Sequence, residues 1–274
     1  MKNALRAILA IIILITGTYA LFGYSQEQKD NKVYEGVEQY INSFADPNEI
    51  VIFPGQDETG LEIVSKYQQS YDWEGLLNIN KDIVGWLYIP DNDVINFPIV
   101  KGSNNSYYLN HDYTKKWNGD GAAFVDYKNN KYSLSKVIYG HNMSLSSTKP
   151  IFTTIVNWKD EEYFNSHRTL YYTDANGMTK KYLIVALAHF NVAAKEEYSY
   201  LDTMFETEED FRGWIEYIKE HSRYYDLGDN TIDYRADEVM VLSTCDRKLG
   251  YSSNGRSILF CVNLTNNELD REMD

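Results

Sequence analysis

Residues 238–264 read EVMVLSTCDRKLGYSSNGRSILFCVNL, two apolar runs joined by a polar loop that contains Gly, Ser and Asn. Runs of this kind, bounded by turn residues, are typical of β-strands. Because side chains alternate between the two faces of a strand, Ser243 and Cys245 share one face of the first run. If the two runs form a hairpin, its loop returns Arg256 to the neighbourhood of Cys245.

Similar β-rich runs alternate with turn signals from Val84 onward. They are VGWLYIP (84–90), INFPIVKG (95–102), GAAFVDY (121–127), KVIYGHN (136–142), TLYYTDANG (169–177) and KKYLIVALAHFNVA (180–193). Many short strands at close spacing predict a β-barrel or a β-sandwich, with a hairpin turn at Asp174-Ala175-Asn176-Gly177. The predicted fold class is therefore mostly β with helices.

Three segments have the spacing of helices instead. The first ends near Asp46-Pro47, and its apolar positions are Val33, Val37, Tyr40, Ile41 and Phe44. The second covers about residues 61–79. The third runs from Thr207 to His221 within a long connection between strands; Thr207 can cap an acidic first turn, and the apolar stripe is Phe211, Trp214, Ile215 and Ile218.

The composition excludes several classes of protein. With 26 Lys+Arg against 40 Asp+Glu the formal charge is −14, which argues against a nucleic-acid partner, because binding to phosphates depends on Lys and Arg. A hydrophobic content of 43% excludes a disordered chain. The sequence also lacks GxxxxGK[ST], HExxH, GxSxG and CxxC, so the common nucleotide, zinc-protease, serine-hydrolase and dithiol motifs are missing.

The N-terminal segment predicts a membrane anchor. Residues 7–24 (AILAIIILITGTYALFGY) carry no charge, and 18 helical residues would span roughly 27 Å. Lys2 and Arg6 precede the segment, so the positive-inside rule keeps residues 1–6 as a cytoplasmic tail and places the remainder outside. A cleaved signal peptide is the competing interpretation, although Thr18-Tyr19-Ala20 is a poor cleavage site.

The two cysteines allow three interpretations. Cys245 and Cys261 could form a disulfide, both could be structural, or one could be a reactive thiol. Cys261 lies inside an apolar strand, whereas Cys245 ends its strand and is followed by Asp246, Arg247 and Lys248. We therefore predict that Cys245 is free and accessible to substrate.

Cysteine chemistry on an acyl group needs an imidazole to move protons and a cationic donor for the oxyanion. Among the five histidines only His141 ends an apolar strand in a glycine-marked turn, and Tyr139 shares its face. Cys245, His141 and Arg256 thus fill the three roles, with Arg247 as a weaker competitor for the third.

At this point the motifs match a family. The set formed by the N-terminal anchor, NKDIVGWLYIP, NFPIVKG, YYLNHDY, VIYGHNM, VLSTC and GRSILF resembles the class B sortases of Gram-positive bacteria, over roughly residues 75–264. The resemblance implies a closed eight-stranded β-barrel with N-terminal helices and one helix in a long inter-strand connection. It also implies a linker and N-terminal helices at 25–74 and a catalytic domain at 75–268.

The resemblance implies a cysteine transpeptidase that needs no metal or organic cofactor. Its catalytic residues would be Cys245 as nucleophile, His141 as general acid/base and Arg256 as oxyanion donor, and Ser243, Tyr139 and Asn96 would bind substrate. Such an enzyme cleaves an NPxTN-like sorting signal after Thr and transfers the acyl group to a peptidoglycan-precursor amine. Its partners would be surface proteins, the lipid-linked precursor and the cytoplasmic membrane. A pilin-polymerising sortase and a cysteine hydrolase remain alternatives, and an inactive membrane-tethered binding protein is a third.

Overall fold

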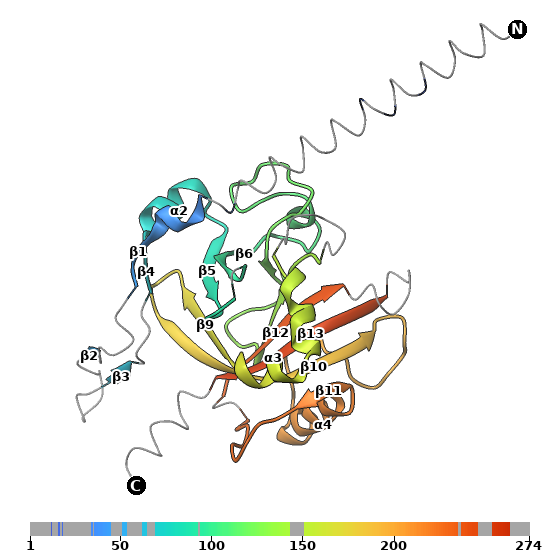
Figure 1. The fold of residues 1–274 in the computed structure, drawn as a ribbon. Helices are drawn as coiled ribbons and strands as arrows, with labels where there is room; N and C mark the ends of the chain where they lie inside the picture. The colour runs from blue at the N-terminus through green and yellow to red at the C-terminus, as the bar shows by residue number, and fades with distance from the viewer. Residues whose placement is uncertain are drawn as a thin grey trace, which may run out of the picture.

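The computed structural model describes residues 36–44, 51–53, 62–64, 69–92, 94–142, 151–234, 237–245 and 254–263, and the single residues 12, 16, 18 and 34. Eight strands close into a barrel, as predicted (Figure 1). In barrel order these are β10 (Thr179–Asn191), β13 (Gly255–Asn263), β12 (Val239–Cys245), β8 (Ser135–Tyr139), β7 (Phe124–Val125), β6 (Asn96–Val100), β5 (Ile83–Tyr88) and β9 (Thr169–Asp174). The pairings are antiparallel except β12–β8 and β6–β7, which are parallel.

The long strand β10 closes the barrel. Its first residues pair with β9, from Thr179↔Thr173 to Leu183↔Thr169. The other edge of β10 pairs with β13 along almost its whole length. β9 pairs with only the first part of one edge of β10. A short strand, β11 (Ser222–Tyr225), pairs with the rest of that edge, and this strand was not predicted from the sequence.

Alternation along β8, β12 and β13 places their side chains in two separate cores, and a third cluster lies between β5, β6, β7 and α2 (Trp73–Ile79). Side chains that point into the barrel include Ile138, Met240, Leu242, Leu259 and Cys261. Their neighbours along the same strands point outward into a second cluster, which includes Val137, Val239, Val241, Ile258 and Phe260. Ser243 and Cys245 continue the outward series, so this polar end of β12 lies on the outside of the barrel.

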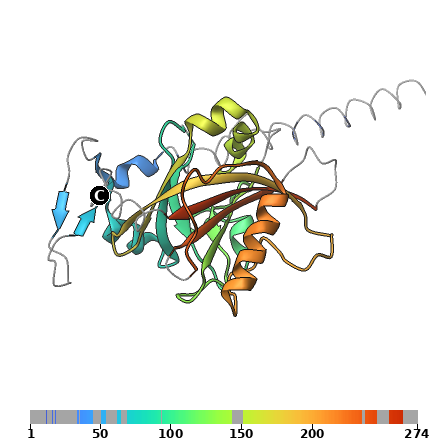
Figure 2. The same cartoon turned by 90° about the horizontal axis from the view of Figure 1, so that it is seen from below.

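The predicted helix between strands is confirmed as α4 (Glu208–Glu220), and it covers the outward cluster. The Thr207 side chain accepts a hydrogen bond from the Asp210 backbone N–H, and the Asp210 carboxylate bonds back to Thr207, so the helix begins in a capping box. Phe211, Trp214 and Ile218 are buried against the barrel. Figure 2 shows α4 beside the strands of one side of the barrel, with α3 (Glu161–Ser166) on another.

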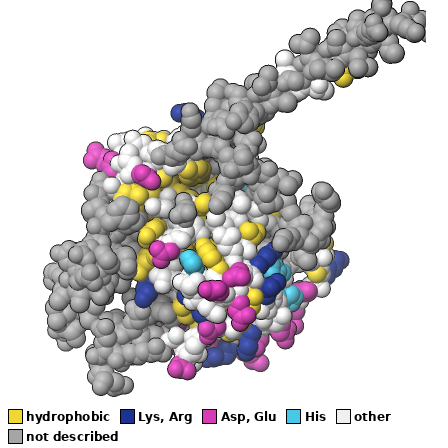
Figure 3. All heavy atoms as spheres, in the orientation of Figure 1, with side chains coloured by type: hydrophobic (Ala, Val, Ile, Leu, Met, Phe, Trp, Pro, Cys, Tyr) yellow, Lys and Arg dark blue, Asp and Glu magenta, His cyan; other side chains and the backbone are white. Residues whose placement is uncertain are grey.

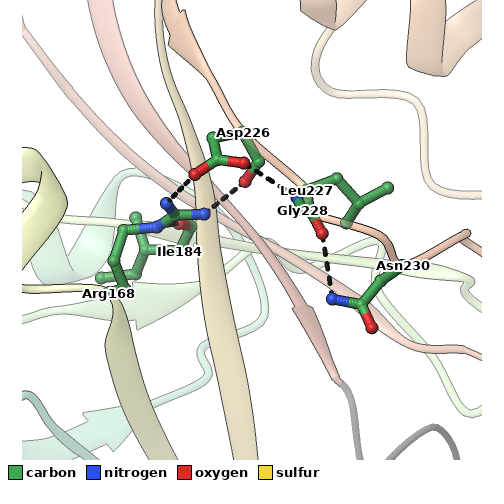
Figure 4. A network of polar contacts seen from close by, with 6 residues as sticks. All are labelled: Arg168, Ile184, Asp226, Leu227, Gly228 and Asn230. Atoms are coloured by element: carbon green, nitrogen blue, oxygen red, sulfur yellow. Dashed lines mark hydrogen bonds and ion pairs between the residues drawn. The ribbon is translucent and has the colours of Figure 1, made fainter.

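A polar network fixes the chain where it leaves β11. The Arg168 guanidinium donates to the Ile184 carbonyl at 2.6 Å, to the Asp226 carboxylate at 2.5 Å and to the Asp226 carbonyl (Figure 4). The hydrogen bond from Arg168, with one from the Gly228 N–H, holds the pKa of Asp226 below its ordinary value. Arg168 therefore joins β10, at Ile184, to the segment after β11, at Asp226.

Two helix predictions in the N-terminal region were correct only in part. Within the described residues, the first segment contains the helical residue Tyr34 and a short 3-10 helix (Val37–Tyr40), which is followed by strand β1 (Ile41–Phe44). The second contains strands β3 (Glu62–Val64) and β4 (Gln69–Tyr71) and, at its end, helix α2 (Trp73–Ile79). β1 pairs with β4, and β2 (Val51–Phe53) pairs with β3, so long-range strand pairing overrides the local apolar spacing.

The predicted anchor, residues 7–24, lies outside the described residues apart from Ile12, Thr16 and Thr18. Within the described part of the chain, no helix is both long and apolar enough to cross a membrane. The surface of the barrel domain is mixed in charge, and acidic and basic side chains gather on the lower part of the face in Figure 3, where α3, α4 and β11 lie.

Candidate active site

Strand register brings Cys245, Arg256, Ser243 and Tyr139 together at one end of β8, β12 and β13. Cys245 lies directly opposite Arg256 in the antiparallel pair β12–β13. Ser243 lies beside Tyr139 in the parallel pair β12–β8. Cys245 and Arg256 are both half-buried, at the point where the hairpin predicted from the sequence leaves the sheet. The return of Arg256 to Cys245 is therefore confirmed as geometry.

His141 reaches the same place because β8 continues alongside β12 beyond its last paired residue. The Gly140 N–H donates to the Ser243 carbonyl at 3.1 Å, and the Thr244 hydroxyl donates to the Gly140 carbonyl at 2.7 Å. On the other side of His141, Asn142 donates from Nδ2 to the Cys245 carbonyl at 3.3 Å. His141 is thus bracketed by two residues that are bonded to the Cys245 strand.

Steric crowding explains why residue 140, in the YGHN turn, is a glycine. A Cβ there would lie 2.5 Å from the Phe152 ring and 2.7 Å from an Ile151 methyl group. The close approach lets the Phe152 N–H donate to the His141 carbonyl at 3.1 Å. A side chain at position 140 would push this segment away and displace His141.

Among the described residues, the His141 ring makes one hydrogen bond, between Nε2 and the Leu109 carbonyl at 2.9 Å. A carbonyl oxygen only accepts, so this contact assigns the proton to Nε2 in the neutral ring and leaves Nδ1 as the nitrogen that can exchange protons. Leu109 ends a 3-10 helix, Tyr107–Leu109, in the connection between β6 and β7. That connection therefore orients the imidazole.

Tyr200 is a neighbour of the site that the sequence analysis missed. It is 3% exposed, and its hydroxyl accepts a hydrogen bond from Ser243 Oγ at 3.2 Å. Burial raises the pKa of Tyr200, while hydrogen bonds and the positive charge of Arg256 oppose that rise. Nothing in the local sequence SYLDT marks this tyrosine, because its importance comes only from packing against β12.

Tyr139 faces the same group of residues from β8. Its ring is half-buried, 5.3 Å from the Phe124 ring, and its hydroxyl donates to the Asp126 carboxylate at 2.7 Å. Burial raises the pKa of Tyr139 well above its ordinary value, and the bond to Asp126 raises it further. The hydroxyl thus stays protonated at neutral pH.

The two cysteines are both free, which agrees with the prediction for Cys245. Cys261 is completely buried in the inward core, and burial raises the pKa of its thiol well above the usual range. It is therefore a neutral, structural thiol. Cys245 differs because it lies on the outward face and at the end of its strand.

Two predicted residues need separate mention. Asn96 lies on β6 and accepts a hydrogen bond from the indole N–H of Trp86 at 2.8 Å, so its substrate role remains only a prediction. Arg247 lies outside the described residues. The other histidines have partners of their own: His111 on Tyr107, His167 on Tyr163, His189 with Ser257 and His221 with Glu196.

The donor set of the site suits acyl transfer better than metal binding. In the described parts of the chain no three His, Cys, Asp or Glu side chains are grouped to hold a metal ion. What the strand ends offer is one thiol, one imidazole, one guanidinium and the hydroxyls of Ser243, Tyr139 and Tyr200. A thiol beside an imidazole and an oxyanion donor can form and release a thioester.

Comparison with known proteins places this arrangement in a family. The chain is 32% identical to sortase B of Listeria monocytogenes over 186 residues, which cover 67% of this chain and 70% of the relative. It is 24% identical to sortase B of Staphylococcus aureus over 243 residues, 87% of each chain. No family model matches it.

The fold agrees with the sequence relatives. The crystal structure of sortase B from Bacillus anthracis superposes with a TM-score of 0.58 at 29% identity, covering 71% of this chain and 86% of that one. Three observations point to the same family: the closed barrel, the hairpin that pairs Cys245 with Arg256, and the degree of sequence identity. The chain belongs to the class B sortases, and it is a sortase-type cysteine transpeptidase.

Proposed function

We infer that this enzyme cleaves a C-terminal sorting signal of the NPxTN type after Thr and transfers the acyl group to an amine of a peptidoglycan precursor, anchoring surface proteins to the cell wall. The observation that carries the assignment of residues is the register that sets Cys245 opposite Arg256, with His141 bracketed beside it. The catalytic residues proposed are Cys245, His141 and Arg256, and the substrate-binding residues are Ser243, Tyr139 and Asn96.

The first acyl transfer forms a thioester. The Cys245 thiolate attacks the threonine carbonyl carbon, a C–S bond forms, and the carbonyl electron pair moves to an oxyanion that accepts hydrogen bonds from Arg256. When the oxyanion collapses, the C–N bond breaks. His141 gives its proton to the departing amine, which leaves as a neutral group.

The second transfer reverses the roles. The incoming amine attacks the thioester carbon and loses a proton to His141, and the C–S bond then breaks to release the Cys245 thiolate. The product is an amide that joins the sorted protein to the precursor. Water in place of the amine would give hydrolysis, and a pilin lysine would give a polymer.

A panel of quenched peptides tests this function. We would incubate the full-length protein, in detergent, with NPxTN, SPxTG and LPxTG peptides, with and without an amine acceptor. Cleavage after Thr that is diverted to an amide by the amine supports transpeptidation and identifies the motif. Cleavage that ignores the amine supports a hydrolase. No cleavage by a folded protein with a free Cys245 would contradict the proposal.

We also propose that residues 7–24 anchor the enzyme, with residues 1–6 in the cytoplasm, 25–74 as a linker region and 75–268 as the catalytic domain outside. An anchor holds the enzyme on the surface that also carries its lipid-linked acceptor, which raises their effective concentration. The protein should stay with alkali-washed membranes, and deletion of residues 1–25 should release it. Release of a chain that has lost its N-terminal segment would instead indicate cleavage of a signal peptide.

A further inference from the structure

A buried carboxylate lies behind the site and has no role in the mechanism above. Asp126 follows β7 and is 7% exposed. Its Oδ2 accepts hydrogen bonds from the Tyr139 hydroxyl at 2.7 Å and from Asn105 Nδ2 at 2.9 Å, and its Oδ1 accepts from the Lys128 N–H at 2.8 Å. A carboxylate can only accept, so both side chains must donate to it. Asp126 therefore fixes the direction of two side chains that belong to different elements.

The first of these is Tyr139. Its proton is committed to Asp126, and the raised pKa of Tyr139 keeps that proton in place. The oxygen of Tyr139 can then act only as an acceptor toward any other group. Tyr139 lies directly beside Ser243 in the parallel strand pair, and Ser243 is two residues before Cys245, so Tyr139 belongs to the same strand ends as the site. An amide N–H of a bound peptide is the chemical class of partner that it suits.

The second is Asn105, in the connection after β6. Its Oδ1 accepts from the Tyr127 N–H at 2.9 Å while its Nδ2 donates to Asp126, so the amide is fixed at both ends. Four residues later the same connection presents the Leu109 carbonyl to His141 Nε2. Asp126 thus holds the base of the segment that orients the imidazole.

We propose that Asp126 is a positioning residue for acyl transfer: it holds the Tyr139 hydroxyl as a hydrogen-bond acceptor toward the substrate, and it anchors the 105–109 segment that orients His141. This inference rests on the function proposed above. Removal of the Asp126 charge frees the Tyr139 proton and loosens the contact between Leu109 and His141, without removing any group that reacts.

The test is a double-mutant cycle on the full-length protein, measured as kcat and KM for the cleaved peptide. Asp126→Asn keeps the shape of the side chain, and Tyr139→Phe removes the hydroxyl. We expect Tyr139→Phe to lower kcat/KM by about tenfold and Asp126→Asn to lower it further, because Asp126 also holds Asn105. The double variant should be within about twofold of Asp126→Asn alone, because Tyr139→Phe removes a contact that Asp126→Asn has already broken. Losses that multiply in the double variant would overturn the proposal, as would wild-type kcat/KM in a folded Asp126→Asn.

A matched control separates positioning from loss of stability. Asp237 is 4% exposed and accepts a hydrogen bond from the Asp233 N–H at 2.8 Å, but it precedes β12, whereas Cys245 ends that strand. Asp237→Asn should lower the melting temperature and leave kcat/KM unchanged. If it lowers kcat/KM as much as Asp126→Asn does, the effect is general destabilisation and the proposal fails.

A second measurement needs no peptide and so distinguishes this inference from failure of the proposed function. The rate of alkylation of Cys245 by iodoacetamide, followed against pH, reports the thiol and the imidazole beside it. Asp126→Asn should shift this profile and Asp237→Asn should not. If wild type cleaves none of the peptides, the proposed substrate is wrong, but an unshifted alkylation profile in folded Asp126→Asn would still reject the positioning role.

Discussion

At one end of β8 and β12, Tyr139 and Cys245 remain half-buried, next to Arg256. The opposite end of these strands, here called the lower end, contains a cluster of charged and aromatic side chains, here called the lower cluster: Lys136, Tyr172, Lys180, Tyr182 and Glu238. Lys180 pairs with Glu238, the Tyr182 hydroxyl donates to Glu238 at 3.0 Å, and Lys136 Nζ lies 4.0 Å from the centre of the Tyr172 ring.

The same strands thus handle polar groups in two ways. The lower cluster compensates its charges by pairing them, which closes that end of the inward core. At the site end, the proposed catalytic residues Cys245, His141 and Arg256 are only half-buried, and the hydroxyls of Tyr139 and Tyr200 lie near them in fixed hydrogen bonds. The comparison predicts that changes at the site end reduce activity and leave stability largely intact, and that changes at the lower end do the reverse.

The largest expected effect is on the nucleophile. Cys245→Ala should lower the rate of peptide cleavage by about 10³-fold or more, because no thioester can form. Cys261→Ala should keep the rate and lose about 1–2 kcal/mol of stability, since it leaves a small void in the inward core. Peptide cleavage and urea unfolding measure the two effects. Residual activity in Cys245→Ala above roughly 1% of wild type would remove Cys245 from its proposed role.

The next effect concerns the oxyanion donor. Arg256→Lys keeps the charge but loses the planar fork of donors, and we expect kcat to fall by roughly 10²-fold to 10³-fold. Arg223→Lys is the control, because Arg223 is exposed on β11 and away from the site. If both variants keep wild-type kcat, Arg247 becomes the stronger candidate for the oxyanion donor.

A third change breaks the lower cluster. Glu238→Gln removes the carboxylate that pairs with Lys180 and whose charge also acts on Lys136, and we expect a loss of about 1–2 kcal/mol with unchanged kcat/KM. Glu208→Gln breaks an exposed pair with Arg212 one helical turn away and should have almost no effect. Urea unfolding compares the two. Lower kcat/KM in stable Glu238→Gln would show that the two ends are coupled.

The sequence predicted the site end better than the N-terminal region, for a physical reason. Cys245 and Arg256 belong to one hairpin, so eleven residues of separation and strand alternation suffice to pair them. In contrast, the spacing of Val37, Tyr40 and Ile41 predicted a helix, but Ile41 pairs with Tyr71 in a strand register set by residues far along the chain. Long-range pairing of this kind leaves no local signal.

The same limit applies within the site. The VIYGHN and LSTC motifs indicated His141, Tyr139 and Ser243, because each ends a strand. Asp126 and Tyr200 were missed because their importance comes from contacts with Tyr139 and Ser243, which only the folded barrel creates. Asn96 was predicted from the resemblance of the NFPIV segment to the family, and in the structure its amide oxygen accepts a hydrogen bond from the Trp86 indole.

The smallest effect is the pH dependence of the lower cluster, and its sign follows from Glu238. Burial alone would raise the pKa of Glu238, but the hydrogen bond from Lys180 and the charges of Lys180 and Lys136 outweigh burial and lower it below 4.5. The folded state therefore favours the ionised carboxylate. Its contribution to stability is fully present above pH 4.5 and is lost as the pH falls through the folded-state pKa.

Wild type and Glu238→Gln should therefore differ most in melting temperature near neutral pH, and the difference should shrink as the pH falls below 4.5. Groups elsewhere in the barrel titrate equally in both proteins, so they cancel in this difference. The wild type and Glu208→Gln should show a small gap at every pH. A gap between wild type and Glu238→Gln that stays constant down to strongly acidic pH would mean that side-chain packing, and not the charge of Glu238, holds the lower end of the barrel together.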